Sequence, residues 1–273
     1  MEIRHRGAVF KLHPESVHDV RMAMLLSGGR TYEPATLQVV LGALQPGSAF
    51  VDVGANNGYF AVLAARRVGT SGTVLAFEPN PSAFRRLKEN VSANHLSNVT
   101  CYEAGLSDRP ELATLGLTAL DDGCGSLHVK RGTRIPVRLI VGDSLLAGRR
   151  IDVVKVDVEG HELQVLHGLT NSIRSPESPL LIVEWNMSHA GTELLDELRA
   201  FSTVYTIART GSGRVKLSLV GGHYDLGENC NLLAVPRSNQ RWCKWVDDVL
   251  RGVSTLDFPV PPSSQLVSQP SRI

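Results

Sequence analysis

The sequence predicts an α/β protein with a mostly parallel, seven-stranded sheet, helices on both faces and an antiparallel closing strand. Short apolar runs alternate with helical patterns between residues 48 and 201, which is typical of a parallel sheet. Two β-rich runs then follow with no clear helix between them, which suits an antiparallel closing pair. A chain of 273 residues that is 42% hydrophobic and 20% charged can bury one large core or two small ones.

The N-terminal region predicts two helices ahead of the sheet. The segments "ESVHDVRMAMLLSGG" and "TYEPATLQVVLGALQPG" have helical patterns, and each is closed by glycine. We expect residues 1–47 to form a helical cap. A central α/β domain then spans residues 48–237, and residues 238–273 form a C-terminal helix with a Pro- and Ser-rich tail that we expect to be disordered.

The central domain predicts seven strands, four helices and one inserted hairpin. The strands are expected at 48–54, 72–79, 98–108, 151–160, 178–186, 203–210 and 229–237. The helices are expected at 59–69, 81–95, 161–173 and 191–201. The segment "GSLHVKRGTRIPVRLI" breaks the alternation, because its two β-like runs flank "RGT" in the manner of a hairpin.

Charge and cysteine content exclude several classes of protein. A formal net charge of +1 provides no field that attracts nucleic acid, so we expect no nucleic-acid partner. No stretch of about 18 apolar residues could span a membrane, and the N-terminus lacks the apolar core of a signal peptide. The four cysteines are scattered without a CxxC pair, which argues against a zinc ribbon or a disulfide framework. These features predict a cytoplasmic protein.

The stretch "FVDVGANNGYF" places two glycines, Gly54 and Gly58, where the first predicted strand turns into a helix. In a doubly wound sheet this turn is the usual cradle of a ligand, although an ordinary strand-to-helix turn would also use glycine. The spacing is G-x-x-x-G rather than the dinucleotide fingerprint G-x-G-x-x-G. A smaller group than a pyrophosphate is therefore indicated, such as the amino-acid end of a nucleoside cofactor.

Glu78 ends the next predicted strand, about 20 residues beyond the glycine turn, where an acid can accept hydrogen bonds from both ribose hydroxyls. The alternative is a carboxylate at the start of a helix beside Pro79, since acids favour helix N-termini. The glycine turn upstream favours ribose binding.

Taken together in this order, "FVDVGANNGYFAVLAA", "VLAFEPNP", "AGLSD", "VVKVDVEGHELQVLHG" and "LLIVEWN" resemble the FkbM family of S-adenosylmethionine-dependent methyltransferases. The resemblance covers roughly residues 32 to 208. It implies a Rossmann-like class I methyltransferase fold for the domain at 48–237. It also implies methyl transfer from S-adenosyl-L-methionine, most often to a hydroxyl of a sugar, glycolipid or polyketide.

The resemblance also implies which residues hold the cofactor. Those of the turn that holds the methionine part are Asp52, Gly54, Ala55, Asn56 and Gly58. Glu78 corresponds to the ribose-binding acid. The segment after the third strand usually recognises adenine, and its candidates are Glu103, Ala104, Ser107 and Asp108. We assign no role to Asn57.

Catalysis is expected in "KVDVEGHE", at the end of the fourth strand. Methyl transfer to a hydroxyl requires removal of the acceptor proton, and the pKa of histidine suits that task. His161 is therefore our first candidate for the general base, with Asp157 and Glu159 as orienting or alternative groups; the alternative for His161 is a helix cap. Lys155 lies two residues before Asp157, and we expect an ion pair between them.

The next strand ends in two more polar residues, Glu184 and Asn186. Together with Asp157 they could hold Mg²⁺ and so acidify an acceptor hydroxyl, but a plain substrate-binding site would have the same residues, and we do not favour the metal. We expect Glu184, Asn186, His189 and Tyr32 to contact a small-molecule or glycan acceptor.

Two other functions remain open from the sequence. A nicotinamide-dependent oxidoreductase would share the sheet and the ribose acid, but it would normally have the three-glycine fingerprint. A methyltransferase-like binding subunit could keep the cofactor turn without catalysis, although the intact "DVEGHE" argues against it. Methyl transfer to nitrogen or to a carboxylate is a further alternative. The acceptor and the oligomeric state cannot be deduced from the sequence.

Overall fold

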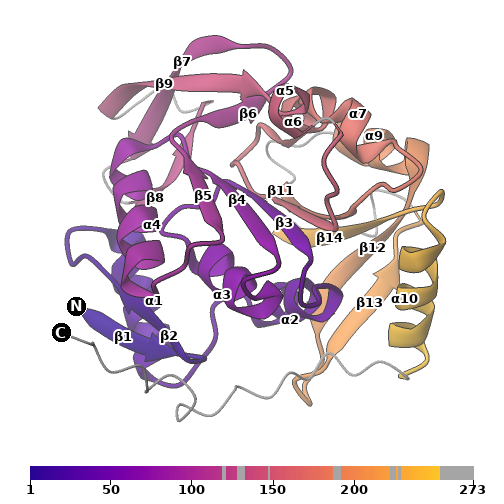
Figure 1. Cartoon of the computed structure of the whole chain (residues 1–273), viewed down its shortest axis with the longest axis horizontal. Helices are drawn as coiled ribbons and strands as arrows, with labels where there is room; N and C mark the ends of the chain where they lie inside the picture. The colour runs from indigo at the N-terminus through magenta and orange to yellow at the C-terminus, as the bar shows by residue number, and fades with distance from the viewer. Residues whose placement is uncertain are drawn as a thin grey trace.

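An eight-stranded sheet runs through the centre of the computed structural model, which describes residues 1–118, 121–127, 133–146, 148–186, 192–221, 226 and 229–252 (Figure 1). Its strand order is β13-β12-β14-β11-β10-β3-β4-β5. In chain order the strands are β3 (Ala49–Val53), β4 (Thr73–Phe77), β5 (Val99–Tyr102), β10 (Val153–Val156), β11 (Leu180–Asn186), β12 (Ser202–Arg209), β13 (Val215–Leu219) and β14 (Asn229–Pro236).

The first five of these strands pair in parallel, whereas β14 lies antiparallel between β11 and β12. The predicted fold class is confirmed. β13 adds an eighth strand, because it pairs antiparallel with β12 at the edge of the sheet. This short strand was not expected from the sequence.

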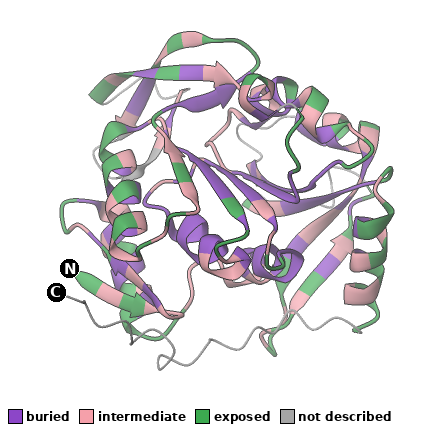
Figure 2. Cartoon of the chain, in the orientation of Figure 1, coloured by how far each residue is buried: buried purple, intermediate pink, exposed green. Residues whose placement is uncertain are grey.

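Helices cover both faces of this sheet, because successive side chains of a strand point to opposite sides. Phe50 of β3 packs into one apolar cluster and Val51 into the other. The first cluster includes side chains of α1 (Val17–Ser27), α2 (Pro34–Ala43), α3 (Tyr59–Val68), α4 (Pro81–Ala93) and α10 (Gln240–Leu250). The second includes α5 (Asp143–Leu146), α6 (Glu162–Gly168), α7 (Thr170–Ile173) and α9 (Glu193–Phe201). Figure 2 shows the central strands buried and the outer faces of α4 and α10 exposed.

The N-terminal region forms the two predicted helices, α1 and α2, and a hairpin that the sequence analysis missed. Strands β1 (Glu2–His5) and β2 (Ala8–Lys11) pair antiparallel. Arg6 and Gly7 join them with φ angles of 49° and 74°, as a tight two-residue turn requires. The domain boundaries at 47/48 and 237/238 stay a prediction.

A second sheet with the order β6-β9-β7-β8 lies above the central one in Figure 1. It comprises β6 (Gly105–Ser107), β7 (Glu111–Thr118), β8 (Asp121–Ser126) and β9 (Thr133–Val141). The first run and the turn of the hairpin expected around "RGT" fall largely on residues 128–132, which lie outside the described residues; within the described residues, β8 and β9 each pair with β7. The β7–β9 pairing buries Leu115, Val137 and Leu139 in a small cluster of their own, which favours it.

None of the helices in the described part of the chain is both long enough and apolar enough to cross a membrane.

Candidate active site

The principal pocket of the described chain opens at the carboxyl ends of the parallel strands, where ligands bind in open α/β sheets. The glycine turn after β3, Glu78 after β4, Asp157 after β10 and Glu184 near the end of β11 all line it. The segment around α1 and α2 contributes further lining residues, and so does the second sheet. The residues from these two regions are His18, Tyr32, Glu33, Gly105, Leu106, Leu115, Gly125, Leu127 and Leu139.

Position 54 must be glycine because the end of β10 packs directly against it. A Cβ at Gly54 would lie 1.8 Å from the carbonyl oxygen of Asp157, so only glycine lets the ends of β3 and β10 approach this closely. Three residues of the turn have positive φ: Gly54 at 82°, Asn56 at 48° and Gly58 at 86°. The backbone N–H groups of Gly54 and Ala55 both donate to the carbonyl of Phe77 at 3.0 Å, which fixes the turn against β4.

Glu78 is buried behind this turn, with 7% of its surface exposed. Its Oε2 accepts a hydrogen bond from the Asn56 N–H, and its Oε1 accepts one from the Asn80 N–H, each at 2.8 Å. Burial raises the pKa of Glu78 to about 7, although these N–H groups and Arg86 oppose the shift. A carboxylate offers about four lone-pair sites, so Glu78 can still accept from two further donors. Asn80 is the N-cap of α4, so Glu78 does not cap that helix directly.

Lys155 forms the expected ion pair, with its Nζ 2.6 Å from Asp157 Oδ2. It is only 2% exposed, and its Nζ lies 4.6 Å from the centre of the Phe60 ring. Burial disfavours its charge, but Asp157, Glu33 and Asp52 outweigh burial and raise the pKa of Lys155. Asp52 sits opposite Lys155 in the β3–β10 register, is 1% exposed and is not among the residues that line the pocket. Burial raises its pKa to about 6.

Asp157 and Glu184 share a hydrogen bond at the floor of the pocket. Burial and the Asp157 carboxylate raise the pKa of Glu184 to about 10, so Glu184 keeps its proton at neutral pH. Burial also opposes ionisation of Asp157, but the Lys155 ammonium outweighs it and holds the pKa of Asp157 below its usual range. The pair is therefore a carboxylic acid beside a carboxylate.

Oxygen atoms of Asp157, Glu159 and Glu184 lie within 4.8 Å of one another, so within the described residues these three could hold a metal ion. The set of possible metal ligands in the sequence analysis contained Asn186 in place of Glu159. Asn186 lies opposite Asn229 in the β11–β14 pairing and is not among the residues that line the pocket.

His161 lines the pocket at the start of α6. Its Nε2 lies 2.9 Å from Ser107 Oγ, and Ser107 Oγ donates to Asp108 Oδ1 at 3.1 Å. In that arrangement Ser107 accepts from Nε2–H, which leaves the basic lone pair of His161 on Nδ1. His161 occupies the N-cap position of α6, but its side chain makes no capping hydrogen bond there, so the capping alternative holds for its position only. Glu162 fixes the preceding loop, because its Oε1 accepts from the N–H groups of Val158 and Gly160 at 3.1 Å.

The pocket residues that the sequence analysis missed include two ionisable ones, Glu33 and His18. Glu33 precedes Pro34 at the start of α2, where an acid is unremarkable in sequence, but its φ of 40° is unusual for a non-glycine residue. Its Oε2 accepts from Asn231 Nδ2 at 3.1 Å, and burial raises its pKa. His18 contacts the predicted residue Tyr32 edge to face, with ring centres 5.6 Å apart.

The structure does not bring all the predicted residues into the pocket. Glu103 is exposed and lines a separate, shallow surface depression beside α4. Asp108 is exposed and Ala104 is buried, and neither lines the principal pocket. Ser107 is 1% exposed and acts on the pocket only through His161. His189 lies outside the described residues.

Comparison with known proteins adds an independent observation. A family model described as the methyltransferase FkbM domain matches residues 52–206. Hexuronic acid methyltransferase AglP of Haloferax volcanii is 33% identical over 173 residues, which cover 62% of this chain and 68% of that protein. Methyltransferase 1 of Beauveria bassiana is 28% identical over 187 residues, which cover 59% of this chain and 70% of that protein.

Solved structures with a similar chain path include a SAM-dependent O-methyltransferase from Thermotoga maritima, with a TM-score of 0.45, 15% identity, and coverage of 80% of this chain and 71% of that one. They also include TYW2 of M. jannaschii in complex with AdoMet, with a TM-score of 0.45, 15% identity, and coverage of 86% of this chain and 84% of that one.

Proposed function

The chain belongs to the FkbM family of S-adenosylmethionine-dependent methyltransferases, and we propose that it is an O-methyltransferase acting on a hydroxyl of a sugar, glycolipid or polyketide-type natural product. One observation carries this proposal. The glycine turn and the buried Glu78 line the same pocket as the Asp157–Glu184 pair and His161, so a nucleoside site and a proton-accepting group adjoin each other.

The residues present fit S-adenosylmethionine. Glu78 is a buried carboxyl with acceptor capacity to spare for two ribose hydroxyls. The turn from Gly54 to Gly58 offers a backbone surface for the methionine part. When bound, the cofactor supplies an electrophilic methyl group on a sulfonium. Asp52 is buried opposite Lys155 and does not line the pocket, and Ser107 contacts His161, so their roles in our proposal are indirect.

His161 is our proposed general base. Nδ1 would take the acceptor proton while Ser107 holds the ring through Nε2, and a general base of this kind typically contributes about 10² to 10⁴ in rate. Protonated Glu184 donates its hydrogen bond to Asp157, which stays ionised beside Lys155, and the pair could orient the acceptor hydroxyl by accepting a hydrogen bond from it. Tyr32 and His18 would line the acceptor side of the pocket.

A metal ion bound by Asp157, Glu159 and Glu184 is the second candidate for acceptor activation, since their oxygens lie within 4.8 Å of one another. We favour His161, because Asp157 is already neutralised by Lys155 at 2.6 Å and Glu184 is protonated in the absence of a metal.

The acceptor class is tested by a methyl-transfer screen. The purified protein is incubated with S-adenosylmethionine and with sugars, uronic acids and hydroxylated polyketides, and products are identified by mass spectrometry. Hexuronic acids belong in the screen because one relative is named for them. Methylation at a hydroxyl supports the proposal. Methylation confined to carboxylates or amines would contradict O-methylation of a hydroxyl, and binding without transfer to any acceptor would favour a catalytically silent subunit.

A further inference from the structure

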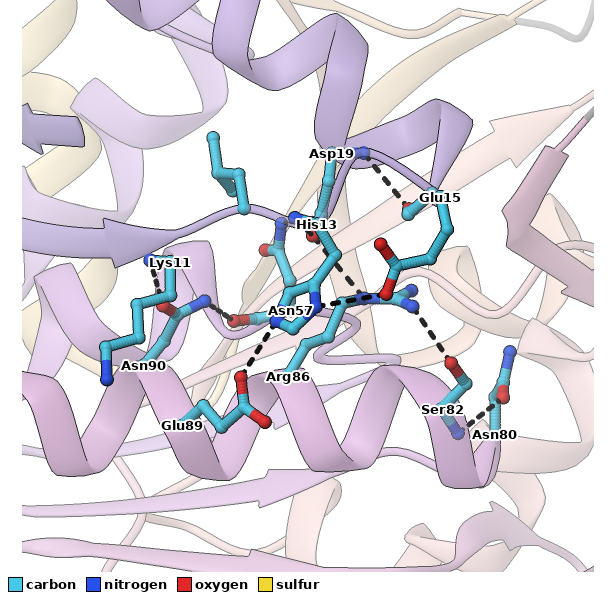
Figure 3. Close-up of polar contacts among 12 residues, drawn as sticks. Lys11, His13, Glu15, Asp19, Asn57, Asn80, Ser82, Arg86, Glu89 and Asn90 are labelled. Atoms are coloured by element: carbon cyan, nitrogen blue, oxygen red, sulfur yellow. Dashed lines mark hydrogen bonds and ion pairs between the residues drawn. The ribbon is translucent and has the colours of Figure 1, made fainter. Parts of the chain in front are cut away.

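Asn57 is the most firmly tethered residue of the glycine turn. It is 1% exposed, and its Nδ2 donates to Asp19 Oδ1 at 2.8 Å (Figure 3). Its backbone carbonyl accepts from Asn90 Nδ2 at 2.8 Å, and its Oδ1 accepts from the Tyr59 N–H at 3.3 Å. The turn is therefore bonded from behind to α1 and to α4, two helices that do not adjoin it in the sequence.

Asp19 is the centre of this buried network. It is fully buried in the first turn of α1, and its Oδ2 accepts from the His13 N–H at 2.9 Å. The same oxygen lies 3.6 Å from Nε of Arg86, which is 1% exposed. Arg86 Nη1 donates to Ser82 Oγ at 3.1 Å, and the charge of Arg86 favours the ionised form of Glu78. The charge of this buried arginine therefore acts both on the carboxyl of α1 and on the acid proposed to bind ribose, and Figure 3 shows Arg86 with its contacts to Asp19 and Ser82.

The N-terminal hairpin is fastened to the same helix. Asn90 Oδ1 accepts from the Lys11 N–H at 2.6 Å. Asn94 bonds both backbone groups of Val9, accepting from its N–H at 2.8 Å and donating to its carbonyl at 2.6 Å. The segment from Val9 to Asp19 therefore has specific polar contacts with α4 as well as with the turn.

The conformation of the turn explains why such support matters. Asn57 lies between Asn56, whose φ of 48° is uncommon for a non-glycine residue and depends on the surrounding structure, and Gly58, whose φ of 86° favours glycine. The N–H of Asn56 is the group that meets Glu78 Oε2. Any shift of Asn57 would move this N–H, and with it the backbone surface offered to a ligand.

We propose that Asn57, Asp19 and Arg86 are positioning residues for the cofactor: the N-terminal segment holds the glycine turn and Glu78 in the geometry that binds S-adenosylmethionine. Asp19 and Arg86 are not among the residues that line the pocket, so they act through Asn57 and Glu78. The inference rests on the proposed function, because it takes S-adenosylmethionine as the ligand of the turn.

Exchanging the side chains of Asp19 and Asn57, which hydrogen-bond to each other, tests the inference. Asp19→Asn removes the counter-charge of Arg86, and Asn57→Asp sets two carboxyls 2.8 Å apart, so we expect each to weaken binding of S-adenosylmethionine about 10-fold or more. The double variant again has one carboxylate and one amide, with the hydrogen bond reversed. Its affinity should return to within about threefold of the wild type. Calorimetric titration measures all four proteins.

A matched control separates positioning from general stability. Asp152 is also a buried carboxyl, 2% exposed, with two arginine partners, Arg150 and Arg241, but it precedes β10 at the opposite end of the sheet from the pocket. Asp152→Asn should lower the thermal midpoint while leaving the affinity within about twofold of the wild type. If Asp19→Asn does not fold, Asn57→Ala replaces it, since that variant keeps Asp19 beside Arg86.

The outcomes distinguish this inference from the proposed function. A wild-type protein that does not bind S-adenosylmethionine contradicts the proposed function, and this inference with it. Folded single variants with wild-type affinity contradict the inference alone. So does a double variant that fails to regain affinity, or an Asp152→Asn variant that loses as much affinity as Asp19→Asn.

Discussion

At the residue scale, Gly54 decides how closely two parallel strands approach at the pocket. The carbonyl group of Asp157 fills the space that a side chain at position 54 would need. The glycine therefore lets the turn after β3 pack against the end of β10, which carries Asp157. Glu78 acts in the same way, because its two oxygens tie the turn to the start of α4. Both residues therefore organise the pocket as well as lining it.

We expect Gly54→Ala to lower the free energy of unfolding by more than about 3 kcal/mol, because the new Cβ would overlap the Asp157 oxygen at 1.8 Å and φ is 82°. Gly29→Ala is the control. Gly29 also has a positive φ, 68°, but its Cβ would meet nothing within 4 Å, so the cost should be about 1 to 2 kcal/mol. Urea titration measures both, and equal losses would show that the close approach of the strands does not matter.

The raised pKa of Glu78 predicts a pH dependence of stability. Its pKa rises from an ordinary 4.5 to about 7 in the folded chain. Between these values the folded protein holds a proton that the unfolded chain has lost, so the free energy of unfolding falls as the pH rises, by at most about 1.4 kcal/mol per pH unit for this group. The raised pKa values of Asp52 and Glu184 act in the same direction.

Glu78→Gln isolates the contribution of this one group. In urea titrations of ligand-free protein, the variant should lose less stability than the wild type between about pH 5 and pH 7, because it carries no titrating proton at this position. Identical slopes in the two proteins would place the pKa of Glu78 near its ordinary value.

At the scale of elements, the ends of the parallel strands carry the acidic residues of the pocket, and the N-terminal segment contributes further residues that line it. The sequence predicted the positions of the acidic groups at the ends of β10 and β11, because a charged residue that follows an apolar run marks the end of a buried strand. The Lys155–Asp157 ion pair was predicted because the two residues lie two apart in the sequence, and it is confirmed. Glu33, His18 and Asp19 were not predicted, because they reach the site through tertiary packing of α1 and α2, which residue spacing does not encode.

The two mechanisms of acceptor activation have different outcomes. If His161 is the base, His161→Ala should cut turnover by about 100-fold or more while the affinity for S-adenosylmethionine stays within about twofold. His167→Ala, an exposed histidine on the same helix, should be as active as the wild type. Steady-state kinetics and calorimetry measure the two quantities separately.

Removal of metal ions with EDTA tests the alternative mechanism, in which a bound metal activates the acceptor. With His161 as the base, EDTA should leave turnover unchanged. An enzyme that EDTA inactivates and Mg²⁺ restores, with His161→Ala still active and Asp157→Ala inactive, would assign activation to a metal held by Asp157, Glu159 and Glu184.

At the scale of the whole molecule, the fold followed from hydrophobic periodicity. The central strands are buried on both faces and are read from sequence as short apolar runs, which is why the parallel core was predicted. The hairpin β1–β2 and the edge strand β13 were missed, because they are short and carry polar residues on an exposed face. The pairing of β7 with β9 was not predicted, because sequence proximity favoured a local hairpin around "RGT".

The central claim is that the glycine turn and Glu78 hold S-adenosylmethionine, and calorimetry of the wild type and Glu78→Ala tests it most directly. We expect the wild type to bind S-adenosylmethionine and not NADH. The variant should lose about 1.5 to 3 kcal/mol of binding free energy, because two charge-assisted hydrogen bonds to the ribose are removed. Binding of NADH without S-adenosylmethionine, or equal affinity in the two proteins, would contradict the account.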